Sequence, residues 1–398
     1  MKDLKHLYYF EKLLEDANNE LVRQAQSEGL KCIATTCENV PEPLLNLPGI
    51  FSVRLRAPRT GSMEMATYYM TSFLCEYSRA LLERAIEGGY NFVDGIVTPD
   101  GCTMMNRCLE NMELLKTMGE GKDGFFWEYM EIPQKNDDNA LEMYTLQCRN
   151  HILKPLADKY GIDTSDQAIR AAVEQHNEVC RLIRAIGDFR KEANPRVTGY
   201  EFHILTMVSY VAPKHLIVDK LRETLEKIKT REPDAADKYR ARVVFVGSEV
   251  DDVDVIRLVE ESGAYVCADR FCYGSLPGRD EILLNDDEDV VKQVCRQVQG
   301  RAQCPRYWDM AKMTGRRDYV ADLAKEYGAD GIIYEQMKFC DPWAYERMIG
   351  TIVLRDEHGY PVLAVDRPYS IGSSGQMRTR VQAFVESIEI KKIQGGKK

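Results

Sequence analysis

Short apolar segments alternate with segments of helical periodicity along most of this 398-residue chain. Such apolar segments are typical of buried parallel strands, because helices cover both faces of a parallel sheet. We expect strands at 31–36, 50–55, 92–98, 240–246, 264–268, 331–334 and 360–365. The alternation predicts an α/β protein built from doubly wound parallel sheets.

A helix-rich stretch divides this pattern into two parts. We expect an N-terminal α/β domain with a leading helix at 1–138, a helical insert at 139–238 and a C-terminal α/β domain at 239–398. Within the first domain a long helix is expected from Met63 to about Gly88. The sequence therefore predicts two Rossmann-like domains that face each other across a cleft.

Charge and hydropathy exclude several classes of partner. The formal net charge of −10 argues against nucleic acid or an anionic membrane as the main partner. No apolar run approaches the ~20 residues that a membrane span needs. The charged N-terminus lacks the apolar core of a signal peptide. We therefore expect a cytoplasmic protein.

The chain contains twelve cysteines, which a cytoplasmic protein rarely pairs as disulfides. No CxxC pair is present and the chain has only six histidines, so zinc is a poor candidate. Ligation by thiolates far apart in sequence fits an iron–sulfur cluster better. Many free cysteines are simply buried small hydrophobic residues. We expect this of Cys32, Cys148, Cys180, Cys267 and Cys295.

Four other cysteines, Cys37, Cys102, Cys272 and Cys340, follow expected strands directly. In open α/β sheets the carboxyl ends of the strands form the crevice in which ligands bind. If the two domains turn these edges toward each other, the four thiols converge on one cleft. Two further candidates are Cys304, in a loop, and Cys75, which is expected in the middle of the helix that begins at Met63.

Some charged residues near these cysteines are also candidates. Glu38 could act as a catalytic acid or base, or it could cap the helix that Pro41 opens. Arg54, Arg56 and Arg59 could bind phosphates, or they could form an exposed strand face. The sequence has no GxGxxG loop and no Walker motif, so we do not expect ATP to bind this chain.

Three stretches resemble the 2-hydroxyacyl-CoA dehydratase / benzoyl-CoA reductase family. They are CEYSRALLERAIEGGYNFVDGIVTPDGC at 75–102, DGIIYEQMKFCDPW at 330–343 and GQMRTRVQAF at 375–384. Weaker similarities are TTCENVPEPLLNLPG at 35–49, CADRFCYGSLPGR at 267–279 and CPR at 304–306. The resemblance extends over nearly the whole chain.

The resemblance implies a [4Fe–4S] cluster held by Cys75, Cys102 and Cys340, with the fourth iron position open. It also implies a separate homodimeric, ATP-hydrolysing iron–sulfur activator that donates single electrons, and a sister subunit. In the dehydratases the electron makes a ketyl radical of a 2-hydroxyacyl-CoA thioester and is recycled. In the benzoyl-CoA reductases it is consumed in reducing the ring.

Two alternatives stay open at this point. Related homodimers carry a double-cubane [8Fe–9S] cluster, which needs about six cysteines from one chain. Adding Cys37, Cys272 and Cys304 to the first three would supply them, and the function would then be ATP-dependent reduction of small molecules. A cluster-free binding protein with buried cysteines is the remote alternative.

Overall fold

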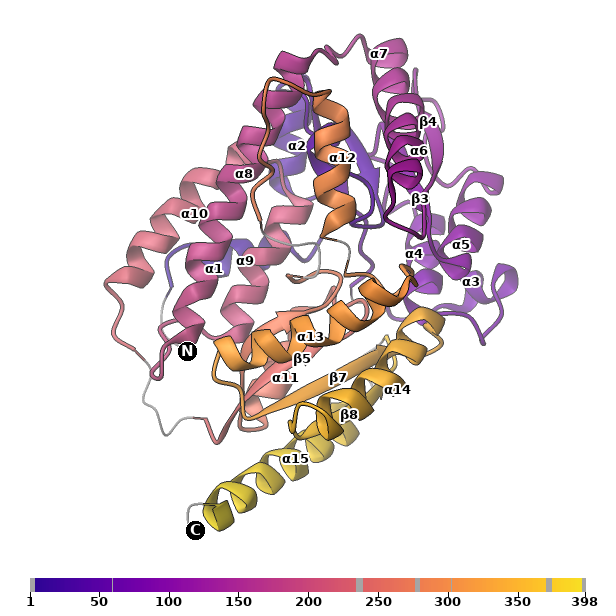
Figure 1. Ribbon diagram of the computed structural model, residues 1–398. Coiled ribbons are helices and arrows are strands. Elements are labelled where there is room, and N and C mark those ends of the chain that lie inside the picture. Colours follow the sequence, from indigo (N-terminus) through magenta and orange to yellow (C-terminus); the bar gives the residue numbers. More distant parts are fainter. Residues whose placement is uncertain are drawn as a thin grey trace.

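The computed structural model describes residues 4–58, 60–233, 239–275, 280–301, 303–369 and 374–395. Its strands form two four-stranded sheets in which all neighbours are parallel (Figure 1). The first has the order β2-β1-β3-β4, with β1 (Lys31–Thr35), β2 (Ile50–Arg54), β3 (Gly95–Asp100) and β4 (Phe126–Glu131). The second has the order β6-β5-β7-β8, with β5 (Ala241–Val246), β6 (Ala264–Arg270), β7 (Gly331–Met337) and β8 (Val362–Arg367).

Alternate residues of β5 show how helices cover both faces of the second sheet. Val244 and Val246 pack in a core with residues of α13 and α14, whereas Val243 and Phe245 pack in another core with residues of α11 and α15. These helices are α11 (Val253–Glu261), α13 (Met310–Glu326), α14 (Asp341–Asp356) and α15 (Ser374–Gly395). Side chains alternate between the faces of a strand, so an apolar run supplies both cores.

The first sheet is covered in the same way. Ala34 and Val53 share a core with residues of α4, α5 and α9, and Ile33 and Val97 share one with residues of α6, α8 and α12. These helices are α4 (Glu76–Ile86), α5 (Thr103–Leu114), α6 (Asp138–Cys148), α8 (Asp166–Asp188), α9 (Gly199–Val211) and α12 (Val290–Gly300). The prediction of an α/β protein with two doubly wound sheets is confirmed.

The remaining helices lie mainly beside the first sheet and between the two sheets. They are α1 (Leu7–Leu13), α2 (Glu20–Ser27), α3 (Glu64–Tyr69), α7 (Lys154–Tyr160) and α10 (Lys214–Lys229), with the short turns η1 (Glu42–Leu45), η2 (Arg149–Leu153) and η3 (Phe189–Lys191). Helix α12 follows β6 in sequence but packs on the core of the first sheet. The domain boundaries at 138 and 238 stay predictions. Among the described residues, no helix is both long and apolar enough to cross a membrane.

The single long helix expected from Met63 to Gly88 is wrong. The chain forms α3, leaves the helical conformation at Met70, whose backbone is extended, and begins α4 after Cys75. Cys75 is therefore the N-cap of α4 and does not lie within a helix. The leading helix is likewise divided, because Asn19 caps a separate α2 by accepting hydrogen bonds from Leu21 and Val22.

A buried ion pair joins the helical region to the end of β6. Arg190 Nη1 lies 2.9 Å from Asp269 Oδ1, and both side chains are buried. We expect Arg190→Met to lower the free energy of unfolding by about 3–5 kcal/mol, because a buried carboxylate loses its partner. Urea denaturation measures this loss.

The control is Arg222→Met, which removes an exposed guanidinium paired with Glu178. Exposed pairs contribute about 0–1 kcal/mol, so we expect a small change. Equal losses in the two variants would contradict the interpretation.

Candidate functional site

Six cysteines line one cavity between the carboxyl ends of the two sheets. The cavity has an empty volume of about 750 Å³, which includes space open to solvent. Its cysteines are Cys37, Cys75, Cys102, Cys272, Cys304 and Cys340. They are the six thiols that sequence reasoning separated from the core cysteines. Topology brings four of them here, because Cys37, Cys102, Cys272 and Cys340 lie in the loops after β1, β3, β6 and β7. Cys75 and Cys304 lie in loops that follow α3 and α12.

Cys75, Cys102 and Cys340 form the first set, and each is the N-cap of a helix. They precede α4, α5 and α14 respectively. Unpaired backbone N–H groups and the positive end of the helix dipole make a helix N-terminus favourable for an anion. Three such ends therefore meet around the first set.

The thiols of the first set lie close enough to affect one another's pKa. Burial raises the pKa of Cys75 to about 12; the backbone N–H groups of Ser78 and Tyr77 oppose this rise, and Cys102 adds to it. Burial also raises the pKa of Cys340, and Cys75 and Cys102 raise it further. Burial therefore disfavours the charged thiolate form of these residues, and the positively charged iron atoms of a bound cluster would favour it.

Cys37, Cys272 and Cys304 form the second set, which lies among carboxylates. Burial raises the pKa of all three thiols. Glu38 adds to the rise for each of them, and Cys304 adds to it for both Cys37 and Cys272. Glu38 is therefore a common neighbour of the three thiols of the second set.

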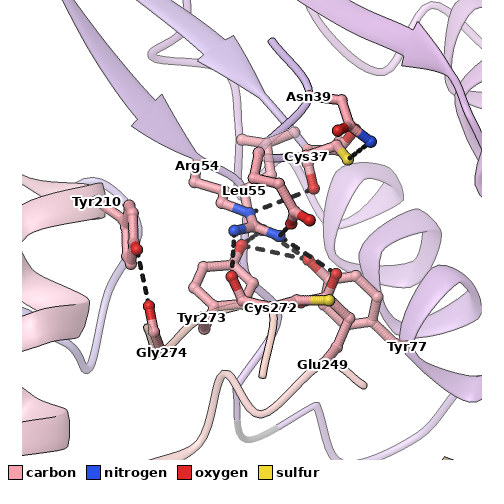
Figure 2. A network of polar contacts seen from close by, with 12 residues as sticks. Cys37, Asn39, Arg54, Leu55, Tyr77, Tyr210, Glu249, Cys272, Tyr273 and Gly274 are labelled. Atoms are coloured by element: carbon pink, nitrogen blue, oxygen red, sulfur yellow. Dashed lines mark hydrogen bonds and ion pairs between the residues drawn. The ribbon is translucent and has the colours of Figure 1, made fainter. Parts of the chain in front are cut away.

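Arg54, the last residue of β2, links the loops of the second set (Figure 2). Its Nη1 donates to the backbone oxygen of Cys272 at 2.5 Å, and its Nη2 lies 3.3 Å from Glu249 Oε1 and 3.8 Å from Glu38 Oε2. The guanidinium also stacks on the ring of Tyr273, 4.1 Å from its centroid. One cation thus connects the ends of β1, β2, β5 and β6.

The interpretation of these arginines as an exposed strand face is wrong for Arg54 and Arg56. Arg54 and Arg56 are buried, with 5% and 4% of their surface exposed. Arg56 donates to the backbone oxygens of Asp251 and Leu14, so it joins parts of the fold and is not available to a phosphate. Arg59 lies outside the described residues.

Glu38 lines the cavity, which is the location that a catalytic acid or base requires. Its Oε1 is buried without a hydrogen-bond partner, and η1 receives no side-chain cap, so the capping alternative is wrong. Burial raises the pKa of Glu38, and Arg54 opposes that rise.

Glu249 is a second cavity carboxylate that sequence reasoning missed. Burial raises its pKa to about 8, against the opposing effect of Arg54. Its position in the loop after β5 is the signal that could have identified it. Cys37, Cys102, Cys272 and Cys340 lie in the same kind of loop, at the carboxyl end of a strand.

The five cysteines predicted to be core residues, Cys32, Cys148, Cys180, Cys267 and Cys295, are buried and do not line the cavity. Cys108, whose orientation the sequence left open, is also buried and does not line it. Cys148 and Cys295 touch across the α6–α12 contact, with their Sγ atoms 3.5 Å apart.

The chemistry of the donors fits a cluster better than a single ion. No three His, Cys, Asp or Glu side chains in the described parts of the chain are arranged to hold one metal ion. Thiolates of an iron–sulfur cluster bind different iron atoms, so they stand farther apart than the ligands of one ion. Met104, Met105, Met337 and Trp343 also line the cavity, and an apolar shell of this kind limits the access of water to a cluster and tunes its reduction potential.

Two parallel doubly wound sheets around a cysteine-lined cavity define a class of α/β enzyme. The sequence profile of the family described as "2-hydroxyglutaryl-CoA dehydratase, D-component" matches residues 37–388. The chain belongs to this family. The match spans every cysteine of both sets, and the chain is therefore an enzyme component of the dehydratase or reductase type.

Individual relatives are similar over almost their entire length. The chain is 23% identical over 381 residues to the (R)-phenyllactyl-CoA dehydratase beta subunit of Clostridium sporogenes, covering 95% of this chain and 97% of the relative. It is 24% identical over 389 residues to one of the subunits of benzoyl-CoA reductase of Thauera aromatica, covering 96% and 97%. It is 23% identical over 373 residues to the beta subunit of (R)-2-hydroxyglutaryl-CoA dehydratase of Acidaminococcus fermentans, covering 92% and 95%.

Proposed function

We propose that this chain is the iron–sulfur catalytic component of an ATP-dependent, low-potential dehydratase or reductase. One observation carries the proposal: Cys75, Cys102 and Cys340 line a common cavity, each at the N-terminus of a helix. Because helix N-termini favour negative charge, three of them stabilise an anionic group held by three thiolates. A [4Fe–4S] cluster is such a group.

When bound, the cluster supplies one-electron chemistry, and the protein supplies binding, orientation and exclusion of water. The thiolates of the first set hold the cluster, and the apolar side of the cavity formed by Met337, Pro342 and Trp343 shields it from water. Glu38 is the proposed acid or base, because it lines the same cavity with an unpartnered oxygen. The substrate we propose is a CoA thioester, as the names of the dehydratase relatives suggest.

Two partners belong to the proposal. A separate homodimeric, ATP-hydrolysing iron–sulfur activator donates the electron, since this chain has no phosphate-binding loop of the Walker type. The enzyme is completed by a sister subunit, because the relatives are named as subunits. The mass of the chain expressed alone, measured by light scattering, distinguishes a homodimer from a chain that awaits a sister subunit.

A second candidate is favoured by a specific observation. The second set, Cys37, Cys272 and Cys304, lines the same cavity as the first. Six thiols around one cavity match the ligand number of a double-cubane [8Fe–9S] cluster, with which a homodimer would reduce small molecules.

Anaerobic purification with iron and sulfide analysis tests both candidates. We expect about four iron atoms per chain for a single cubane and about eight for the double cubane. A chain that contains no iron after anaerobic reconstitution would overturn the proposed function and leave the cluster-free alternative.

Cys304→Ala distinguishes the two clusters. With a cubane on the first set alone, we expect the iron content of this variant to equal that of the wild type. A loss of about half the iron or more would contradict the single cubane and favour the double cubane. Cys32→Ala is the matched control, because Cys32 is buried in β1 and does not line the cavity.

A further inference from the structure

Arg306 connects the two sets of cysteines. It follows Cys304 by two residues and lines the cavity. Its backbone N–H also donates to the Cys304 thiol, which lowers the pKa that burial raises. The main chain of Arg306 is thus in direct contact with the second set.

The side chain of Arg306 reaches the first set. Nη2 donates to the backbone oxygens of Asp100 at 3.0 Å and Ile132 at 2.9 Å, and Nε lies 3.4 Å from the backbone oxygen of Gly101. Asp100 and Gly101 are the two residues before Cys102. A Cβ atom at Gly101 would stand 3.2 Å from Arg306 Nε, so glycine leaves room for this approach. The guanidinium therefore fixes the loop that presents Cys102.

One donor nitrogen of this guanidinium has no hydrogen-bond acceptor. Nη1 of Arg306 is buried and has no hydrogen-bond partner. A guanidinium cannot be deprotonated in a protein, and a buried donor without an acceptor costs about 1–3 kcal/mol. Arg306 is also the one cationic residue among the described residues that line the cavity. An anionic group bound in the cavity would supply both the acceptor and the opposite charge.

We propose that Arg306 is a positioning residue that fastens the Cys102 loop to the Cys304 loop and donates Nη1–H to an anionic sulfur of the cluster. This inference rests on the proposed function, because it needs a cluster in the cavity. Hydrogen bonds to sulfur and nearby positive charge favour the reduced, more negative state of a cluster. Arg306 therefore raises the reduction potential and slows the loss of iron.

Three variants separate the two roles of Arg306. Arg306→Met removes the charge and all donors, whereas Arg306→Lys keeps the charge but lacks the planar fork that reaches several carbonyls at once. Arg296→Met is the control, since Arg296 is exposed and its guanidinium pairs with Glu288, away from the cavity. Each is reconstituted anaerobically without substrate or activator. The readouts are iron content, the rate of iron release to a chelator, and the midpoint potential from a spectroscopic redox titration.

We expect Arg306→Met to release iron about 10-fold faster, in the range seen when outer-shell partners of a metal site are lost, and to have a more negative potential. Arg306→Lys should keep a potential near that of the wild type but still release iron faster. The proposal would be overturned if Arg306→Met had the same rate of iron release and the same midpoint potential as the wild type. It would also be overturned if Arg306→Lys released iron at the wild-type rate. A wild-type chain without iron would instead overturn the proposed function itself.

Discussion

Cys340→Ala is expected to abolish stable cluster binding. Loss of an outer-shell partner typically weakens a metal site about 10–100-fold, and loss of a ligand should exceed that range. Two thiolates, Cys75 and Cys102, would remain on the first set. Iron and sulfide analysis after anaerobic reconstitution and gel filtration measures the loss, and the cluster absorbance should disappear with it.

The fold itself should tolerate this change. Cys340 is only partly buried. Its side chain makes no capping hydrogen bond to α14, so the helix does not depend on the thiol. Cys108→Ala is the matched control, because Cys108 is buried on α5 and does not line the cavity. It lies near the first set, since Cys75 contributes to the raised pKa of Cys108. We expect its iron content to be that of the wild type. Wild-type iron in Cys340→Ala would contradict the assignment of the first set.

The cysteine assignment could be predicted because it depends on chain topology. Residues directly after parallel strands meet at one edge of a sheet, so Cys37 could be grouped with Cys102, and Cys272 with Cys340. Bringing the two pairs together needed the further assumption that the two domains face each other. The core cysteines could be separated because they lie within strands and helices. These are properties of local sequence and do not need side-chain geometry.

Cys75 shows where local pattern fails. Residues 63–88 have continuous helical periodicity, but the chain leaves the helix at Met70 and restarts after Cys75. The restart gives the first set its third helix N-terminus. Tertiary packing decides this break, and intrinsic helix propensity is too weak to predict it.

The buried arginines show a second limit. Alternating residues on a strand suggest an exposed face, yet Arg54 and Arg56 are covered because the second sheet and its loops lie against the end of β2. Arg54 contacts a residue 218 positions away in sequence, and Arg56 contacts one 195 positions away. No single-sequence pattern encodes contacts of this range.

Loss of Arg54 should therefore strongly destabilise the folded state. We expect Arg54→Met to lower the free energy of unfolding by about 3–5 kcal/mol, because two carboxylates in the cavity wall lose their cation. Glu249 and Glu38 lie 3.3 Å and 3.8 Å from Arg54 Nη2. Urea denaturation followed by tryptophan fluorescence measures the change.

A second variant identifies the cause. If the unpaired carboxylate is responsible, Arg54→Met combined with Glu249→Gln should recover part of the lost stability, because the amide can be buried at lower cost than a charge. The stability of Arg54→Lys should lie between that of the wild type and that of Arg54→Met. Lysine keeps the charge but loses the stacking on Tyr273 and the guanidinium hydrogen bond to the backbone oxygen of Cys272. Additive losses in the double variant would contradict this explanation. In that case the hydrogen bond to Cys272 would be the main contribution of Arg54, since it ties β2 to the loop of the second cysteine set.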